Sequence, residues 1–185
     1  MRKLITLFLF LSFSTQGYSQ FFKDNKTVIK YEGYFTFYYD EGNDKIFLEI
    51  KNLDKEFLYV NSLSEGIGSN DIGLDRGQLG NTRVVKFIKA GNKLLLIQPN
   101  QYYRAITDNI EEKKSVEQAF AKSILKGFVI KETKNDKYLV DATSFFIRDA
   151  HGVMGRLSAK KQGKYSLDRS RSAVNLERTK AFPKN

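Results

Sequence analysis

One histidine, no cysteine and one glycine-rich stretch limit the chemistry open to this 185-residue chain. His151 lies within residues 149–152, a sequence typical of a turn. A catalytic zinc site takes most of its ligands from histidine, and the His-Glu-x-x-His motif is absent. A Ser-His-Asp triad would have to use His151, and the Gly-x-Ser-x-Gly motif that often carries the serine is missing. We therefore expect His151 to be a turn residue and this chain to contain no catalytic site.

The segment Gly66–Ser69 invites comparison with phosphate-binding loops. It lacks the third glycine of Gly-x-Gly-x-x-Gly, and no Lys-Ser/Thr pair follows it. Asn70, Asp71 and Asp75 offer oxygen ligands for calcium, but the alternating acidic pattern of an EF-hand is missing. Because cysteine is absent, thiolate metal sites and cysteine nucleophiles are excluded. We expect no cofactor or metal in this chain.

The net charge of +10 raises the question of a polyanionic partner. The basic residues are scattered, and their one concentration is the stretch 160–184. A scattered excess of lysine and arginine is typical of a solvated surface. We therefore expect no nucleic-acid partner.

The N-terminus has the layout of a cleaved signal peptide. Arg2 and Lys3 precede the apolar stretch Leu4–Phe13, and small residues stand at Gly17 and Ser19. The apolar stretch is too short for a membrane span, which needs about 20 residues. We expect residues 1–19 to be removed, no span in the mature chain, and export to the periplasm or beyond the cell.

Alternating apolar and polar residues predict antiparallel hairpins. The expected strands are 34–39 and 45–50, then 57–60, then 83–89 and 93–97, and finally 128–131 and 138–140. Short turns containing glycine, asparagine or aspartate separate the paired segments.

One principal helix is predicted, over about 109–126. Asp108 and Glu111 have the spacing of a capping box, and Gly127 suits the C-terminal stop. One helix face would carry the apolar residues Val116, Ala119, Phe120 and Ile124. We expect this face to pack on the sheet, which makes the fold class α+β: β-rich, mostly antiparallel hairpins with one principal helix.

Two stretches lie outside these elements. Residues 61–82 form a long glycine-rich loop, and long loops in compact domains tend to be functional or mobile. Residues 167–185 are basic and polar. We therefore expect a domain over 20–166, followed by a linker over 167–185.

A series of segments spread over the mature chain resembles the N-terminal domain of unknown function of secreted bacterial zinc-dependent metalloproteases. These segments are 72–80, 84–87, 96–100, 103–105, 120–128, 140–143, 171–174 and 180–185. The resemblance implies an accessory or prodomain-like region whose catalytic domain, with an extended His-Glu-x-x-His zinc motif, lies further along a longer chain. Zinc would bind only there, and the linker would lead toward that domain, so we expect this chain to be a truncated fragment.

The resemblance also implies a contact with the catalytic domain of the same protein. We place that contact at Asp75, Arg76 and Gly77 in the glycine-rich loop, with Arg104 and Arg171. An alternative for Asp75 and Arg76 is a local ion pair that shapes the loop.

A different function remains open, that of a stand-alone exported module that binds glycan or peptide. Its candidate contacts are exposed tyrosines on the hairpins: Tyr34, Tyr38, Tyr39, Tyr102 and Tyr103. Such tyrosines are also frequent as half-buried residues of a sheet.

Overall fold

The computed structural model describes residues 21–22, 27–66, 68 and 70–184. The signal peptide predicted for residues 1–19 lies outside this range. Within the described part, no helix has both the length and the apolar character needed to cross a membrane.

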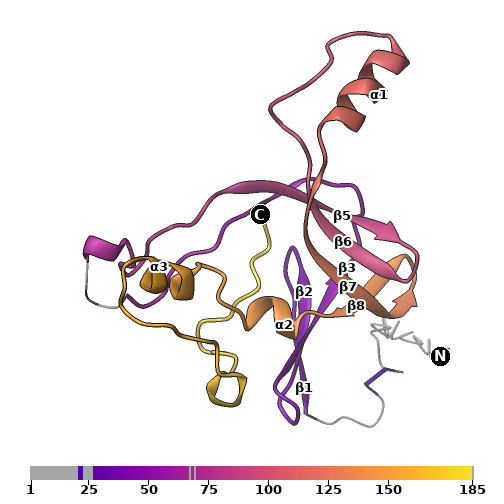
Figure 1. The fold of residues 1–185 in the computed structure, drawn as a ribbon. Helices are drawn as coiled ribbons and strands as arrows, with labels where there is room; N and C mark the ends of the chain where they lie inside the picture. Colours follow the sequence, from indigo (N-terminus) through magenta and orange to yellow (C-terminus); the bar gives the residue numbers. More distant parts are fainter. Residues whose placement is uncertain (1–20, 23–26, 67, 69, 185) are drawn as a thin grey trace, which may run out of the picture.

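The fold is built on one antiparallel sheet of eight strands in the order β1-β2-β3-β8-β7-β6-β5-β4 (Figure 1). The strands are β1 Val28–Tyr31, β2 Thr36–Asp40, β3 Lys45–Ile50, β4 Phe57–Tyr59, β5 Arg83–Ala90, β6 Lys93–Gln98, β7 Ser123–Lys134 and β8 Lys137–Asp141. The predicted β-rich α+β class is confirmed, and so are its three hairpins. Strand β1 was not predicted.

Backbone conformation at the turns explains why these hairpins form where the sequence predicts them. Asn135 and Asp136, between β7 and β8, have φ values of 49° and 58°. Two consecutive residues with positive φ match the right-handed twist of the flanking strands. Gly91, between β5 and β6, also has a positive φ of 57°. Asparagine, aspartate and glycine tolerate this region best, so the turn residues set the register of each hairpin.

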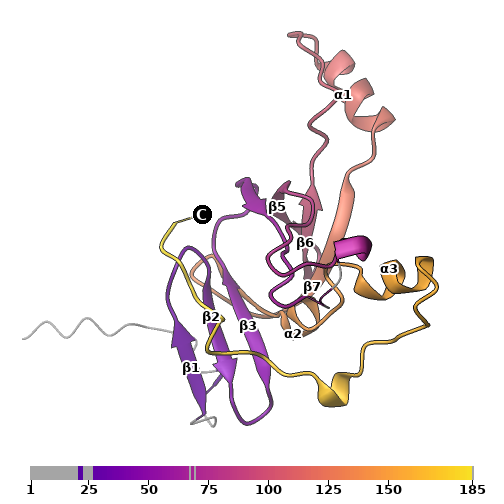
Figure 2. The same cartoon turned by 90° about the vertical axis from the view of Figure 1, so that its left-hand side faces the viewer.

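The principal helix α1 is shorter than predicted and spans Ile110–Ala119. Its N-cap is Asn109, whose side chain accepts a hydrogen bond from the backbone N–H of Glu111, so the predicted cap at Asp108 is wrong. The expected packing on the sheet is also wrong. No residue of α1 is buried, and the helix stands away from the sheet at the end of an arm formed by residues 99–122 (Figures 1 and 2).

The segment predicted as the last turns of this helix belongs to strand β7. Ser123 pairs with Gln98, Ile124 with Ile97 and Lys126 with Leu96 of β6. Leu125 packs against the hydrophobic core as a result. Pairing along β6 satisfies the backbone and buries apolar surface, and these gains exceed the small helix propensities of the segment.

Four short helical elements complete the structure, and none was predicted. They are η1 Asn70–Ile72, α2 Thr143–Phe146, α3 Val153–Ala159 and η2 Arg169–Arg171.

The sheet buries side chains on both faces. The larger cluster lies on one face and includes Phe37, Leu48, Val85, Phe87 and Val140. A smaller cluster of Tyr38, Phe47 and Leu139 lies on the other face, where Phe22 and Val28 pack against it.

The C-terminal segment returns to the sheet. Val174, Leu176 and Ala181 pack against the larger cluster, although residues 167–185 were expected to form a linker. The backbone N–H of Tyr34 donates a hydrogen bond of 2.5 Å to the carbonyl oxygen of Phe182. A Cβ on the neighbouring Gly33 would lie 2.6 Å from that oxygen, so only glycine allows this approach.

Candidate functional site

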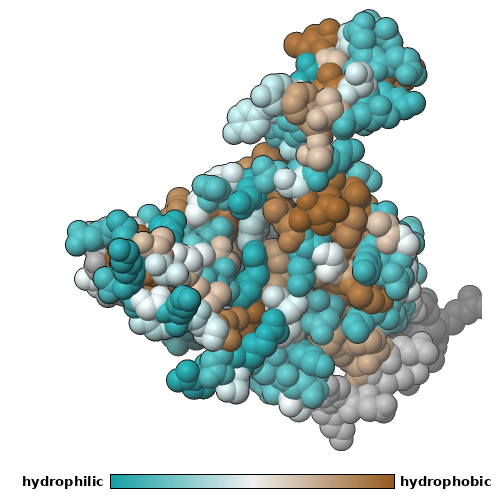
Figure 3. Space-filling model, in the orientation of Figure 1, coloured by the Kyte–Doolittle hydropathy of each residue, from teal (hydrophilic) through white to brown (hydrophobic). Residues whose placement is uncertain are grey.

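An apolar groove of about 290 Å³ lies on the face of the sheet that the C-terminal segment crosses. Strands β2 to β6, helix α2 and residues 179–184 contribute its lining, chiefly Phe35, Phe57, Phe87, Phe145, Ala181 and Phe182. Figure 3 shows hydrophobic side chains gathered on the body of the molecule, just below the arm.

Aromatic rings form the wall of the groove. The ring centroid of Phe57 lies 4.9 Å from that of Phe35 and 5.5 Å from that of Phe87. The series continues through Phe128, which lies 6.1 Å from Phe87 and 5.5 Å from Phe145. Edge-to-face and offset contacts of this kind hold rings in fixed positions. The groove is therefore preformed by packing.

The rim combines exposed apolar side chains with positive charge. Phe146 and Phe182 are 50% and 68% exposed. Arg148 donates a hydrogen bond of 2.7 Å to the Tyr59 hydroxyl, and its guanidinium lies over the Phe145 ring. Lys180 and Lys184 also line the groove. Ring faces with a basic rim suit binding of an apolar, acidic protein surface. Among the residues that the structure describes, those lining the groove include no carboxylate or imidazole for acid–base catalysis.

The glycine-rich loop carries three of the residues predicted for an interdomain contact. The loop folds back on itself, since Gly77 N–H donates to Leu63 O (2.6 Å) and Leu63 N–H donates to Gln78 O (3.0 Å). Arg76 and Gly77 are exposed and Asp75 is half-buried. Asp75 and Arg76 form no ion pair within the described residues, so the local salt-bridge alternative is wrong.

His151 lies in a turn, as predicted, and holds the glycine-rich loop. Its Nδ1 is 3.1 Å from Asn61 Nδ2. Asp149 accepts hydrogen bonds from the backbone N–H groups of Val153 (2.8 Å) and Met154 (2.9 Å), and so starts helix α3. From that helix, Arg156 Nη1 donates to Gly73 O at 2.5 Å. The turn at His151 and helix α3 therefore each bind the glycine-rich loop and stabilise its position.

The two other predicted contact residues lie far from this loop and from each other. Arg104 belongs to the arm at the top of Figure 1, and Arg171 belongs to η2, the yellow turn near the bottom of Figures 1 and 2. The structure thus brings together Asp75, Arg76 and Gly77 but not Arg104 or Arg171.

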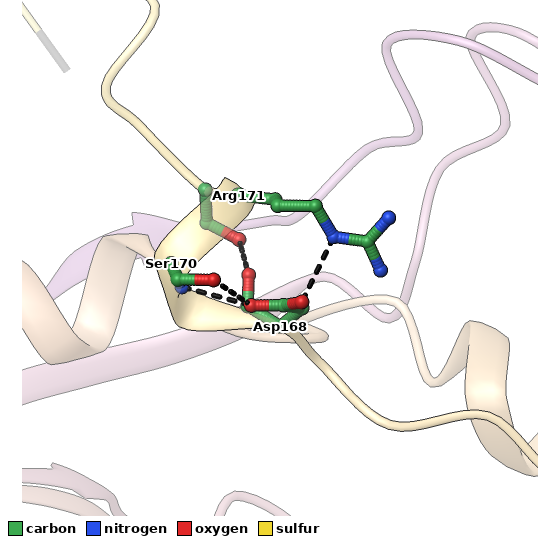
Figure 4. Close-up of polar contacts among 4 residues, drawn as sticks. Asp168, Ser170 and Arg171 are labelled. Carbon is green, nitrogen blue, oxygen red and sulfur yellow. Dashed lines mark hydrogen bonds and ion pairs between the residues drawn. The ribbon is translucent and has the colours of Figure 1, made fainter.

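Arg171 takes part in a compact polar turn (Figure 4). Its Nε donates to Asp168 Oδ2 at 2.8 Å, while Asp168 Oδ1 accepts from the Ser170 hydroxyl (2.6 Å) and the Ser170 N–H (2.9 Å). The Ser170 hydroxyl first, and Arg171 next, hold the pKa of Asp168 below its ordinary value. The cluster is exposed and closes a turn, so it offers a local structural role.

The five candidate tyrosines fall into two groups. Tyr38 and Tyr39 are buried, and Tyr34 lines the apolar groove. Burial, with Asp44 beside the hydroxyl, raises the pKa of Tyr39. Tyr102 and Tyr103 are 91% and 58% exposed on the arm. Of the five tyrosines, only Tyr102 and Tyr103 are exposed.

Sequence reasoning missed most of the groove, because its lining comes from segments far apart in the chain. The pair Phe145–Phe146 and the isolated Phe182 were the available signals, as large apolar residues outside any predicted strand. Within the described residues, no group of three or more histidine, aspartate or glutamate side chains is arranged to hold a metal ion.

Two family models match the chain. The model of the domain of unknown function DUF5118 matches residues 15–66, and that of the domain of unknown function DUF5117 matches residues 77–185. No match was found among curated proteins, and none among solved structures.

Proposed function

The chain belongs to the family of the domain of unknown function DUF5117. We propose that it is a non-catalytic region of an exported zinc-dependent metalloprotease. In this role it is an accessory or prodomain-like module that packs on the catalytic domain, which alone would bind zinc. The resemblance of segments along the mature chain to the N-terminal domain of such enzymes supports the protease context.

The observation that carries the proposal is the apolar groove with its exposed rim. Interface centres are rich in aromatic residues and poor in carboxylates, and the groove has both properties. Phe146 and Phe182 project from the rim, where a partner could bury them. Lys180, Lys184 and Arg148 around the same rim favour an acidic surface on the catalytic domain.

Titration calorimetry between this chain and a separately purified catalytic domain tests the proposal. Phe146→Asp and Phe182→Asp should each weaken binding at least tenfold, because the loss of a buried aromatic contact costs about 1–2 kcal/mol or more. Both side chains are largely exposed here, so the substitutions should leave the fold intact.

Ile106→Asp serves as the matched control, since Ile106 is a fully exposed apolar residue of the arm. It should leave affinity unchanged. If Ile106→Asp is the only variant that weakens binding of the catalytic domain, the contact lies on the arm and the proposed role of the groove is wrong. The contact predicted in the glycine-rich loop is tested by the double variant Asp75→Ala/Arg76→Ala, and unchanged binding would remove the loop from the interface.

A second candidate function, the stand-alone binding module for glycan or peptide, is favoured by one observation. Tyr102 and Tyr103 are exposed on the arm, and Tyr103 lies beside positively charged side chains. Saturable binding of a small ligand by the chain alone would support this function, whether or not a catalytic domain also binds.

A further inference from the structure

A second hollow, of about 370 Å³, lies at the base of the arm and is separate from the apolar groove. Four cationic side chains line it: Lys86 of β5, Arg104 of the ascending segment, Lys113 of α1 and Lys122 of the segment that leads to β7. We call it the basic hollow. Glu117 is the single carboxylate in its lining.

A stacked aromatic pair forms one wall of the basic hollow. The rings of Tyr103 and Phe120 are parallel within 5°, with centroids 4.0 Å apart. Asn100 holds Tyr103 in place, because its Oδ1 accepts the Tyr102 and Tyr103 N–H groups and its Nδ2 donates to Tyr103 O. The stack joins the two ends of the arm, so the wall is preformed although α1 has no buried residue.

The positive charge of the hollow is only partly neutralised within the chain. Lys86 Nζ lies 3.2 Å from Asp54. Arg104 donates to Gln101, which holds its guanidinium without cancelling its charge. Arg104, Lys113 and Lys122 form no ion pair with any described residue. Cations held around one cavity repel one another, and a bound anion would relieve this repulsion.

We propose that the basic hollow binds an acidic saccharide, a sugar unit that carries a carboxylate or a sulfate. The lysines and Arg104 would bind the acidic group, and the exposed ring of Tyr103 would pack against the apolar face of the sugar. Small-ligand sites occupy about 300–1,000 Å³, so the volume suits one or two sugar units better than a protein partner. This inference does not depend on the role proposed for the apolar groove.

Calorimetric titration of the whole chain with short oligosaccharides tests the inference. The probes are an oligogalacturonate for the carboxylate, a sulfated oligosaccharide for the sulfate, a neutral oligosaccharide of the same length, and inorganic phosphate. Saturable binding of either acidic probe, with at least tenfold weaker binding of the neutral probe and of phosphate, supports the proposal. The stronger acidic probe identifies the anionic group.

Two double variants with the same change of charge distinguish specific binding in the basic hollow from nonspecific electrostatic attraction of the acidic sugar to the protein. Lys113→Glu/Lys122→Glu should weaken binding at least tenfold. Lys51→Glu/Lys164→Glu, at exposed positions away from the hollow, should change it less than threefold. Tyr103→Ala should also weaken binding while retaining the circular dichroism of the sheet.

Three results would overturn the proposal: no saturable binding of either acidic probe, equal loss in the two double variants, or phosphate binding as tight as that of the acidic sugar. If the saccharide proposal fails, the proposed role of the apolar groove still stands. That role is tested separately by Phe146→Asp and Phe182→Asp, which lie outside the basic hollow. Conversely, if Phe146→Asp and Phe182→Asp abolish binding of the catalytic domain, the proposal that the basic hollow binds an acidic saccharide is unaffected.

Discussion

At the scale of single residues, several short polar side chains hold turns. Asp149 starts α3, Asn100 closes the turn before Tyr103, and Asp168 closes the turn at η2. Short polar side chains accept hydrogen bonds from nearby backbone N–H groups more readily than they meet distant partners. His151 is an exception, because its Nδ1 contacts the side chain of Asn61, which lies 90 residues away in the sequence.

The turn at Asp168 gives a prediction about pH. Its carboxylate is favoured by hydrogen bonds, so its pKa should lie below the ordinary value of 3.8 in a nuclear magnetic resonance titration. Ser170→Ala should raise this pKa more than Arg171→Gln does, because the Ser170 hydroxyl has the larger effect. A depressed pKa means that the turn is stabilised above the unfolded-state pKa and loosens as pH falls through the folded-state value. An unchanged pKa in Ser170→Ala would contradict this account.

At the scale of elements, the arm and the sheet are stabilised in different ways. The sheet is held by strand pairing and by two apolar clusters. The arm has one short helix without buried residues and closes through the stack of Tyr103 on Phe120. An isolated helix of this length is marginal in water, so the arm depends on its closed ends or on a ligand for its shape.

Removing the arm should therefore leave the sheet stable. Gln98 pairs with Ser123, so an Asn-Gly turn can replace residues 99–122 and join β6 directly to β7. The free energy of unfolding, measured with urea by far-ultraviolet circular dichroism, should change by less than about 1 kcal/mol, the range of substitutions that remove no buried group. The shortened chain should also fail to bind the acidic saccharide. A loss of stability well beyond this range would show that the arm packs on the body.

At the scale of the whole molecule, the regions matched by the two family models share one sheet. Strands β1 to β4 lie within the first region and β5 to β8 within the second. In space, β3 pairs with β8, and β4 pairs with β5. The second region therefore lies between β3 and β4 of the first, and each region supplies partners that the other needs.

Each region should fail to fold alone. We expect the fragments 27–66 and 77–184, divided in the glycine-rich loop, to show no cooperative urea transition separately, because each leaves strand edges and apolar side chains exposed. Mixing the fragments should restore strand signal in circular dichroism and a single transition. A two-state transition in either fragment by itself would contradict interdependent folding.

The sequence by itself determined the hairpins, because alternation and turn residues act over a few neighbouring positions. Asn135 and Asp136 adopt the positive φ that their turn needs, which asparagine and aspartate tolerate well. Only the tertiary structure decided the secondary structure of residues 123–126, because their apolar spacing also fits a helix. They form a strand because they pair with β6. The same holds for the groove, which joins Phe57, Phe145 and Phe182 from separate parts of the chain. A sequence pattern over a few residues determines the conformational preference of that segment. Which strands pair and which cavities form depend instead on the burial of apolar surface between distant segments.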